Sequence, residues 1–173
     1  MSGTGANRMT EKALAELLPP EMTGLRFRHL MAFKIDVHPP SIVGMTPGYD
    51  RRIGELIGGT FEGERLRGTF RSGGSDWQSL RGDGAIIADV RAVMETDDGA
   101  LIGLRYAGIR CGPKAVIERL ARGEPVRPSE YYFRVRARFE TAHPKHDWLN
   151  RVLCIATGHR FPEGPLYNVF EIA

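Results

Sequence analysis

Short runs of alternating apolar and polar residues, separated by turn-forming residues, cover most of the chain from Gly24 onward. Such alternation is typical of strands with one buried face, because successive side chains point to opposite sides of a sheet. The pattern predicts eight strands, at residues 26–38, 55–62, 65–71, 85–95, 100–109, 130–141, 148–158 and 166–172. Most of them follow one another in hairpin order, so we expect antiparallel pairing.

The strand predicted at residues 130–141 separates two faces clearly. One face carries Tyr131, Phe133, Val135, Ala137 and Phe139, and the other carries Tyr132, Arg134, Arg136, Arg138 and Glu140. We expect the apolar face to lie in the core and the polar face to lie outside, unless the polar face lines a wet ligand cavity. Tyr132 and Glu140 then lie about 27 Å apart at the usual strand rise, too far to contact one small ligand.

The strongest hairpin signal in the chain is the dipeptide Asp98-Gly99, which lies between the predicted strands 85–95 and 100–109. If these two residues form the whole loop, Arg91 faces Tyr106 across the pair. Asp83 and Asp89 then extend a polar strip on the same face, which either stabilises the sheet through cross-strand pairs or forms part of a site.

Helical signals are few. Residues 113–122 predict one short internal helix, with Pro113 in its first turn and Gly123 after its end. Near the N-terminus, Thr10 is a candidate cap for a helix over residues 12–18 that Pro19 and Pro20 end. Eight antiparallel strands avoid open edges by closing or stacking. We therefore predict an all-β fold, an antiparallel β-barrel of about eight strands with one short internal helix and an N-terminal helical arm. The arm spans residues 1–24 and the single barrel domain spans residues 25–173.

Composition narrows the function classes. The chain has 173 residues, a net charge of +3 and two cysteines, Cys111 and Cys154. Its basic residues are spread along the chain among acids, so we expect no nucleic-acid partner, although the alternating arginines at 134–138 would suit a phosphate groove. No apolar stretch is long enough for a membrane span, and no secretory signal is evident. We expect a cytoplasmic protein.

Motifs for cofactors and nucleophiles are missing from the sequence. Gly58-Gly59 and the Ser72–Ser75 segment match no nucleotide-binding pattern and are interpreted as turns or bulges. His143 and His146 have a spacing that could bind metal, but a surface loop is the simpler interpretation. His29 shares a face with apolar neighbours and is interpreted as a core histidine. We expect no cofactor and no metal.

The pair Asp76-Trp77 is the most suggestive local feature. A carboxylate beside an aromatic face is a common way to hold and deprotonate a flat organic molecule. The alternative is a core tryptophan beside a turn-capping aspartate, and the sequence leaves the two open.

An ordered set of motifs resembles the family called domain of unknown function 3237, also grouped as UPF0311 proteins. The motifs are Gly58-Gly-Thr-Phe-Glu-Gly63, Ser72-Gly-Gly-Ser-Asp-Trp77, Arg81-Gly-Asp-Gly84, Thr96-Asp-Asp-Gly99, Tyr131-Tyr-Phe-Arg134, Phe139-Glu-Thr141 and Trp148-Leu-Asn150. The resemblance covers residues 25–173 and implies a compact antiparallel barrel, often oligomeric, without a settled activity. The family pattern falls on Asp76, Trp77, Arg134, Glu140, Trp148 and Asn150, among others.

Two hypotheses follow from these residues. The first is a cofactor-independent isomerase, tautomerase or cyclase acting on a small cyclic or aromatic carbonyl-containing metabolite. Its catalytic candidates are Asp76, Arg134 and Glu140, with Asp76 as a base whose pKa the Trp77 wall raises, and its substrate-binding candidates are Trp77, Tyr106, Tyr132, Trp148 and Asn150. The alternative is a non-catalytic carrier or sensor that pairs a small hydrophobic acid with Arg134. We also expect a homo-oligomer, because the apolar arm needs a surface to pack on.

Overall fold

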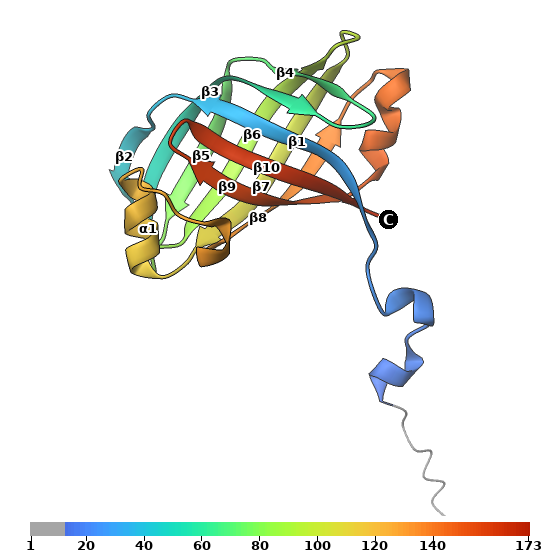
Figure 1. Cartoon of the computed structure of the whole chain (residues 1–173), viewed down its shortest axis with the longest axis horizontal. Coiled ribbons are helices and arrows are strands. Elements are labelled where there is room, and N and C mark those ends of the chain that lie inside the picture. The colour runs from blue at the N-terminus through green and yellow to red at the C-terminus, as the bar shows by residue number, and fades with distance from the viewer. Residues whose placement is uncertain (1–12) are drawn as a thin grey trace, which may run out of the picture.

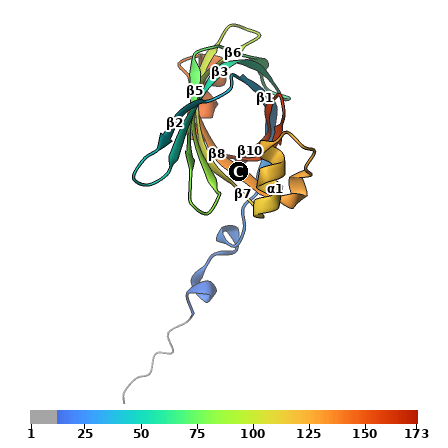
Figure 2. The same ribbon diagram turned by 90° about the vertical axis from the view of Figure 1, so that its left-hand side faces the viewer.

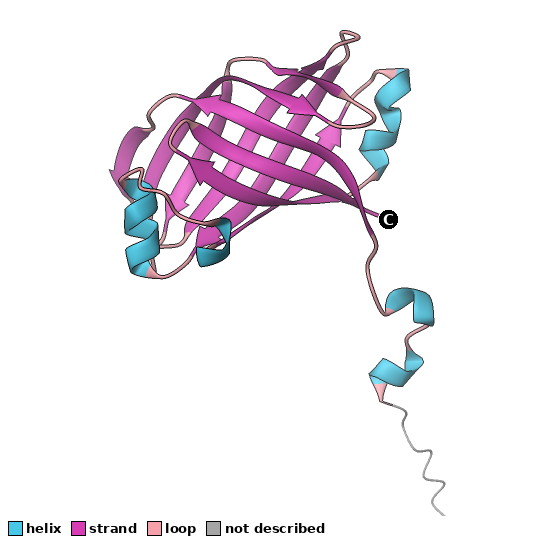
Figure 3. Ribbon diagram, viewed as in Figure 1, coloured by secondary structure: helices cyan, strands magenta, loops and turns pink. Residues whose placement is uncertain are grey.

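The computed structural model describes residues 13–173. Strands make up most of this part (Figure 3). The strands are β1 (Phe27–Val37), β2 (Ser41–Met45), β3 (Asp50–Glu62), β4 (Arg67–Phe70), β5 (Gly74–Leu80), β6 (Ile86–Thr96), β7 (Leu101–Cys111), β8 (Tyr132–Glu140), β9 (Cys154–Phe161) and β10 (Gly164–Ile172). The helices are α1 (Lys114–Ala121) and the 3-10 segments η1 (Leu14–Leu17), η2 (Pro20–Met22), η3 (Pro128–Glu130) and η4 (Pro144–Arg151).

The strands close into an antiparallel barrel, as the alternation predicted. The order runs β1-β10-β9-β8-β7-β6, and β1 also pairs with β3. The strands β4 and β5 both lie between β3 and β6 and together fill one strand position of the ring. β5 pairs near one end of the barrel and β4 near the other. The ring therefore has eight strand positions, and β2 pairs only with β3 beside it (Figure 2).

Side-chain parity places the core as expected. Along β8, buried and exposed residues alternate through the whole strand, with Phe133 inside and Arg134 outside. The half of the barrel away from α1 is filled by aromatic rings: the centroids of Phe33 and Phe70 lie 5.5 Å apart, and those of Phe61 and Phe70 lie 5.8 Å apart. This half is a packed core, so a ligand inside the barrel can lie only toward the α1 end.

Several local predictions were wrong at identifiable places. The segment Pro144–Arg151 forms the 3-10 segment η4 where we predicted the start of a strand, and β9 begins at Cys154. The strands β2 and β5 were not predicted, because β2 is only five residues long and β5 consists mostly of glycine and polar residues. His29 is exposed and contacts Asn168, since a bulge between His29 and Met31 shifts the alternation of β1.

The β6–β7 hairpin has a different register from the predicted one. Glu95 pairs with Leu101, and the Thr96 N–H donates to the Ala100 carbonyl, so three residues form the loop. Gly99 takes a positive φ of 82°, which a glycine at the last loop position allows. A shift of one residue moves a side chain to the other face. Tyr106 is consequently buried inside the barrel, and it does not join a polar strip with Arg91.

The described part of the N-terminal arm extends away from the barrel (Figure 1). Its 3-10 segments η1 and η2 contain no buried residue, and Leu14, Leu17 and Leu18 are exposed. The predicted cap Thr10 lies outside the described residues. None of the helices in residues 13–173 is long and apolar enough to cross a membrane.

Candidate active site

A cavity of about 510 Å³ lies in the barrel at the α1 end. The packed aromatic half of the barrel forms its base, and α1 lies at the rim of this end in Figures 1 and 2. Ile117 and Leu120 of α1 and the loop residue Pro162 contribute apolar wall at the opening. The cavity is large enough for a small organic molecule, and its wall contains a few polar groups among apolar ones.

Asp76 is placed inside this cavity by the strand β5. Its cross-strand neighbours are Gly54 on β3 and Val90 on β6, which offer no polar side chain to its carboxylate. One carboxylate oxygen, Oδ2, accepts a 2.6 Å hydrogen bond from the Gln78 amide. The other oxygen, Oδ1, is buried and has no hydrogen-bond partner. Since buried polar atoms are nearly always bonded, an oxygen without a partner is unusual and marks Asp76 as a candidate functional residue.

The surroundings of Asp76 also change its acidity. Burial raises the pKa of Asp76 from 3.8 to about 6, and the hydrogen bond from Gln78 and the charge of Arg110 reduce this rise. Desolvation disfavours the charged form of a carboxyl group. A base whose pKa lies near neutrality is well matched to proton transfer, because it can both accept and return a proton at working pH.

Two tyrosines form the floor beside Asp76. Tyr106 on β7 and Tyr167 on β10 are both buried, and the Tyr167 hydroxyl donates to the Tyr106 hydroxyl across the barrel at 3.1 Å. Val90 stands between Asp76 and Tyr106 in the same row of paired residues. Burial raises the pKa values of Tyr106 and Tyr167 well above the ordinary value of a tyrosine, so both hydroxyls stay protonated and can donate hydrogen bonds.

Two arginines face the same cavity from neighbouring parts of the barrel, Arg110 on β7 and Arg160 on β9. The Arg110 guanidinium lies 5.8 Å from the centre of the Phe133 ring, and its Nε is buried without a partner. Burial lowers the pKa of Arg110, and the positive charge of Arg160 lowers it further. A third arginine at the wall, Arg52, pairs with Asp50 at 3.0 Å.

A glycine lets Phe133 pack closely against β9 in the cavity wall. Gly158 lies on the inner side of β9, and a Cβ placed there would come within 2.7 Å of the Phe133 ring. The Phe133 ring therefore packs over Gly158, and the Arg110 guanidinium lies over the same ring. The glycine thus makes room for the Phe133 ring, which lines the cavity.

The structure brings together only two of the eight predicted site residues, Asp76 and Tyr106. Trp77 is about half exposed on the outer face of β5, because adjacent strand residues point in opposite directions. The pKa of Asp76 is therefore raised by burial in the barrel, and the predicted Trp77 wall is not its cause. Tyr132 and Arg134 also lie outside, where the Arg134 guanidinium stacks on Tyr132 at 5.1 Å.

The other three predicted residues lie toward the opposite end of the barrel. Glu140 is exposed at the end of β8. Trp148 in η4 packs under the Arg65 guanidinium at 3.8 Å, and Asn150 exchanges hydrogen bonds with the Thr141 backbone. Their contacts tie η4 to the barrel.

Sequence reasoning missed several polar residues of the cavity, among them Arg110, Arg160 and Tyr167. Arg110 follows Tyr106 by four positions and therefore shares its face, so a correct β6–β7 register would have identified it. The other two come from β9 and β10, and only closure of the barrel brings them near Asp76.

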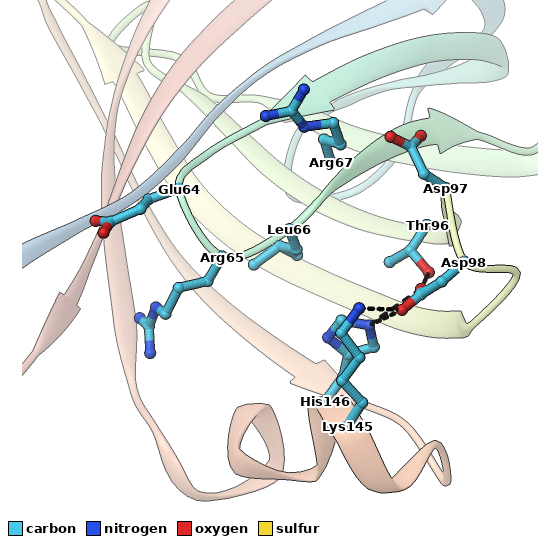
Figure 4. Close-up of a pocket in the computed structure, with 9 residues that line it drawn as sticks. All are labelled: Glu64, Arg65, Leu66, Arg67, Thr96, Asp97, Asp98, Lys145 and His146. Carbon is cyan, nitrogen blue, oxygen red and sulfur yellow. Dashed lines mark hydrogen bonds and ion pairs between the residues drawn. The ribbon is translucent and has the colours of Figure 1, made fainter.

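A smaller pocket of about 210 Å³ lies at the opposite end, beside the β6–β7 loop (Figure 4). Its centre is the Asp98 carboxylate, which accepts hydrogen bonds from Lys145 and Thr96 and contacts His146 Nε2 at 3.2 Å. These partners hold the pKa of Asp98 well below its usual range. The carboxylate is thus already satisfied, so this pocket fits a structural tie better than a reactive centre.

The histidine pair considered as a metal site belongs to this same region. The His143 and His146 rings stack with centroids 5.4 Å apart, and His146 is buried against Asp98. Within residues 13–173, no group of three or more histidine, cysteine, aspartate or glutamate side chains is arranged to hold a metal ion.

Comparison with known proteins gives consistent results. The profile of the family described as "Protein of unknown function (DUF3237)" matches residues 25–172. A UPF0311 protein from Rhodopseudomonas palustris is 38% identical over 122 residues, which cover 70% of this chain and 80% of that protein.

Solved structures show the same barrel. A conserved protein of unknown function from Rhodopseudomonas palustris aligns with a TM-score of 0.84 and 32% identity, covering 87% of this chain and 99% of that one. A protein described as an enzyme from Penicillium herquei aligns with a TM-score of 0.68 and 22% identity, covering 90% of this chain and 100% of that one. The latter likeness shows a shared fold.

Proposed function

This chain belongs to the DUF3237 family of proteins of unknown function, and we propose that it is a cofactor-independent enzyme that transfers protons on a small cyclic or aromatic carbonyl compound, with Asp76 as the general base. The observation that carries this proposal is the Asp76 carboxylate itself. It lies in a cavity of about 510 Å³, one of its oxygens has no partner, and its pKa is raised to about 6.

The chemistry would proceed without an external electron acceptor. Asp76 removes a proton from a carbon next to the carbonyl group, and the electron pair of that C–H bond moves toward the carbonyl oxygen. The protonated Asp76 then returns the proton to a different atom of the same molecule, so the substrate is isomerised and the enzyme is restored. General acid–base catalysis of this kind contributes about 10²–10⁴-fold to rates.

Negative charge that develops on the substrate oxygen needs a donor in the same cavity. The Tyr106 hydroxyl lines the wall in the same row as Asp76 and is a suitable donor. In this respect it replaces Arg134 and Tyr132, which lie on the outer face of the barrel. Fixed donors in a desolvated site stabilise such charge without the reorganisation that water would require.

Exchange of carbon-bound hydrogen for deuterium tests the proposal directly. The protein is incubated in D2O with 4-acetylbenzoate, phenylacetone and 1-tetralone, three enolisable aromatic ketones, and exchange is followed by proton NMR. We expect the wild-type protein to accelerate exchange in at least one of them, and Asp76→Asn to lower that rate by about 10²-fold or more. Asp97→Asn, which removes a carboxylate at an exposed loop position, is the matched control.

The rival function is a carrier or sensor for a small hydrophobic acid. The two arginines of the cavity favour it, because a guanidinium binds a carboxylate well. The enzymatic proposal would be wrong if the wild-type protein bound 4-acetylbenzoate but exchanged the hydrogens of this ketone no faster than the Asp76→Asn variant does. The protein would then be such a carrier.

A further inference from the structure

The cavity is lined by more positively charged than negatively charged side chains. Three arginines and two carboxylates line it, and Arg52 is already paired with Asp50. Glu118 on α1 reaches toward Lys114, with 3.9 Å between the Glu118 and Lys114 charges. None of the ion pairs found in residues 13–173 involves Arg110 or Arg160. Two guanidiniums of one cavity are therefore left without a carboxylate partner.

The position of Arg110 makes this imbalance costly. Its Nε is a buried donor without an acceptor, and a buried unsatisfied donor lowers stability. Arg160 adds a second positive charge nearby, which acts against the ionisation of Arg110. A bound anion would satisfy the free donor and reduce the repulsion between the two cations.

Arg110 and Asp76 lie at different depths of the cavity. Asp76 shares a row of paired residues with Val90 and Tyr106, whereas Arg110 lies four residues further along β7, in the row of Ile86 and Phe133. Four residues correspond to about 13 Å along a strand. Ala88, which pairs with Gly108, lies between the two levels and lines the cavity with an apolar methyl group.

From this arrangement we infer that the natural ligand is a small organic acid with an apolar or aromatic body, whose carboxylate is held by Arg110 and Arg160 toward the opening while its enolisable carbon lies at Asp76. The inference rests on the proposed function for the role of Asp76, since it names the class of substrate on which that base acts. The carboxylate fixes the orientation of the molecule, because only one end of the cavity offers unpaired cations.

A matched pair of probes isolates the carboxylate. 4-Acetylbenzoate and 4-acetylbenzamide have nearly the same shape, and each places a methyl ketone across a ring from the acid or amide group. Binding is measured at pH 8 by titration while the arginine Nε–H signals are followed by NMR. We expect the acid to bind wild-type protein about tenfold or more tightly than the amide, because a hydrogen bond to a charged group is lost with the amide.

Variants assign the preference to the two arginines. Arg110→Gln and Arg160→Gln should each reduce the preference for the acid to about twofold or less while leaving the affinity for the amide unchanged. Arg110→Lys keeps the positive charge at this position, so it provides a second variant if Arg110→Gln does not fold. Arg136→Gln, on the outer face of β8, is the control.

The outcomes separate this inference from the proposed function. Equal affinity for acid and amide, no binding of either, or a preference that survives both Arg→Gln variants would overturn the inference. If exchange of the methyl hydrogens depends on Asp76 but is equally fast in the acid and the amide, the proposed function is supported and the inference on ligand class is wrong. An acid preference that depends on Arg110, with no exchange dependent on Asp76, would support the inference on ligand class and refute the base.

Discussion

Replacement of Asp76 by asparagine should make the folded protein more stable at neutral pH. The Asp76 carboxylate is desolvated in the cavity, and its pKa rises from 3.8 to about 6. Asparagine has a similar shape and can still accept the hydrogen bond that Gln78 donates at 2.6 Å. The substitution therefore removes the buried charge and leaves the packing largely intact.

The pKa of Asp76 gives the size and sign of the effect. Because the pKa is higher in the folded state than in the unfolded one, the folded state binds more protons between about pH 4 and about pH 6. Asp76 therefore costs no stability below about pH 4, and its cost grows as the pH rises to about 6. At about 1.4 kcal/mol for each pKa unit, the full cost is about 3 kcal/mol.

Urea unfolding of wild type and Asp76→Asn at pH 4, 5, 6, 7 and 8 measures this difference. We expect wild type and Asp76→Asn to have nearly equal free energies of unfolding at pH 4. At pH 7 we expect the free energy of unfolding of Asp76→Asn to exceed that of wild type by about 2–3 kcal/mol. Asp97→Asn should show no such pH-dependent gain, because Asp97 is exposed. A gain that is absent, or equal at all five pH values, would refute the argument that burial raises the pKa of Asp76.

Three further predictions concern the barrel around the site. Gly158→Ala should destabilise the protein by about 1–3 kcal/mol, measured as a lower urea midpoint, because the new Cβ would come within 2.7 Å of the Phe133 ring. Glu171→Gln should cost about 1–3 kcal/mol in the same assay, since the buried carboxylate forms ion pairs with two arginines. Cys154 should resist iodoacetamide at pH 8 while Cys111 reacts, because burial raises the pKa of the Cys154 thiol to about 12.

Each of these predictions has a control and a result that would contradict it. Gly82→Ala adds a Cβ with nothing within 4 Å, so equal losses for Gly82 and Gly158 would show that the Phe133 contact is not responsible. Glu62→Gln removes an exposed carboxylate from the same barrel and should cost less than Glu171→Gln. Modification of both cysteines at the same rate in the folded protein would contradict the buried environment of Cys154.

The alternation of residue types was sufficient to predict much of the barrel. It placed Phe133 inside and Arg134 outside on β8 correctly. Pro113 and Gly123 at the two ends of the segment located the short helix α1. It failed where the local pattern is broken by backbone geometry. The bulge in β1 moved His29 to the outside, and a three-residue loop in place of a two-residue loop moved Tyr106 to the inside.

The candidate site was predicted less completely than the fold. Asp76 was recognisable because a carboxylate beside an aromatic residue can hold and deprotonate a flat organic molecule, but the sequence did not say which of Asp76 and Trp77 points inward. The structure gives that answer through the pairing of Asp76 with Gly54 and Val90.

By itself, the sequence determined the properties that depend on neighbouring residues: the strand and helix segments, the faces of regular strands, and Asp76 as a candidate base. Only the tertiary structure decided which residues meet. Arg110, Arg160 and Tyr167 come from three strands, and they line one cavity with Asp76 because the ring closes between β1 and β3. The physical reason is that alternation is local, whereas strand register and closure depend on loop lengths, bulges and pairings between distant segments.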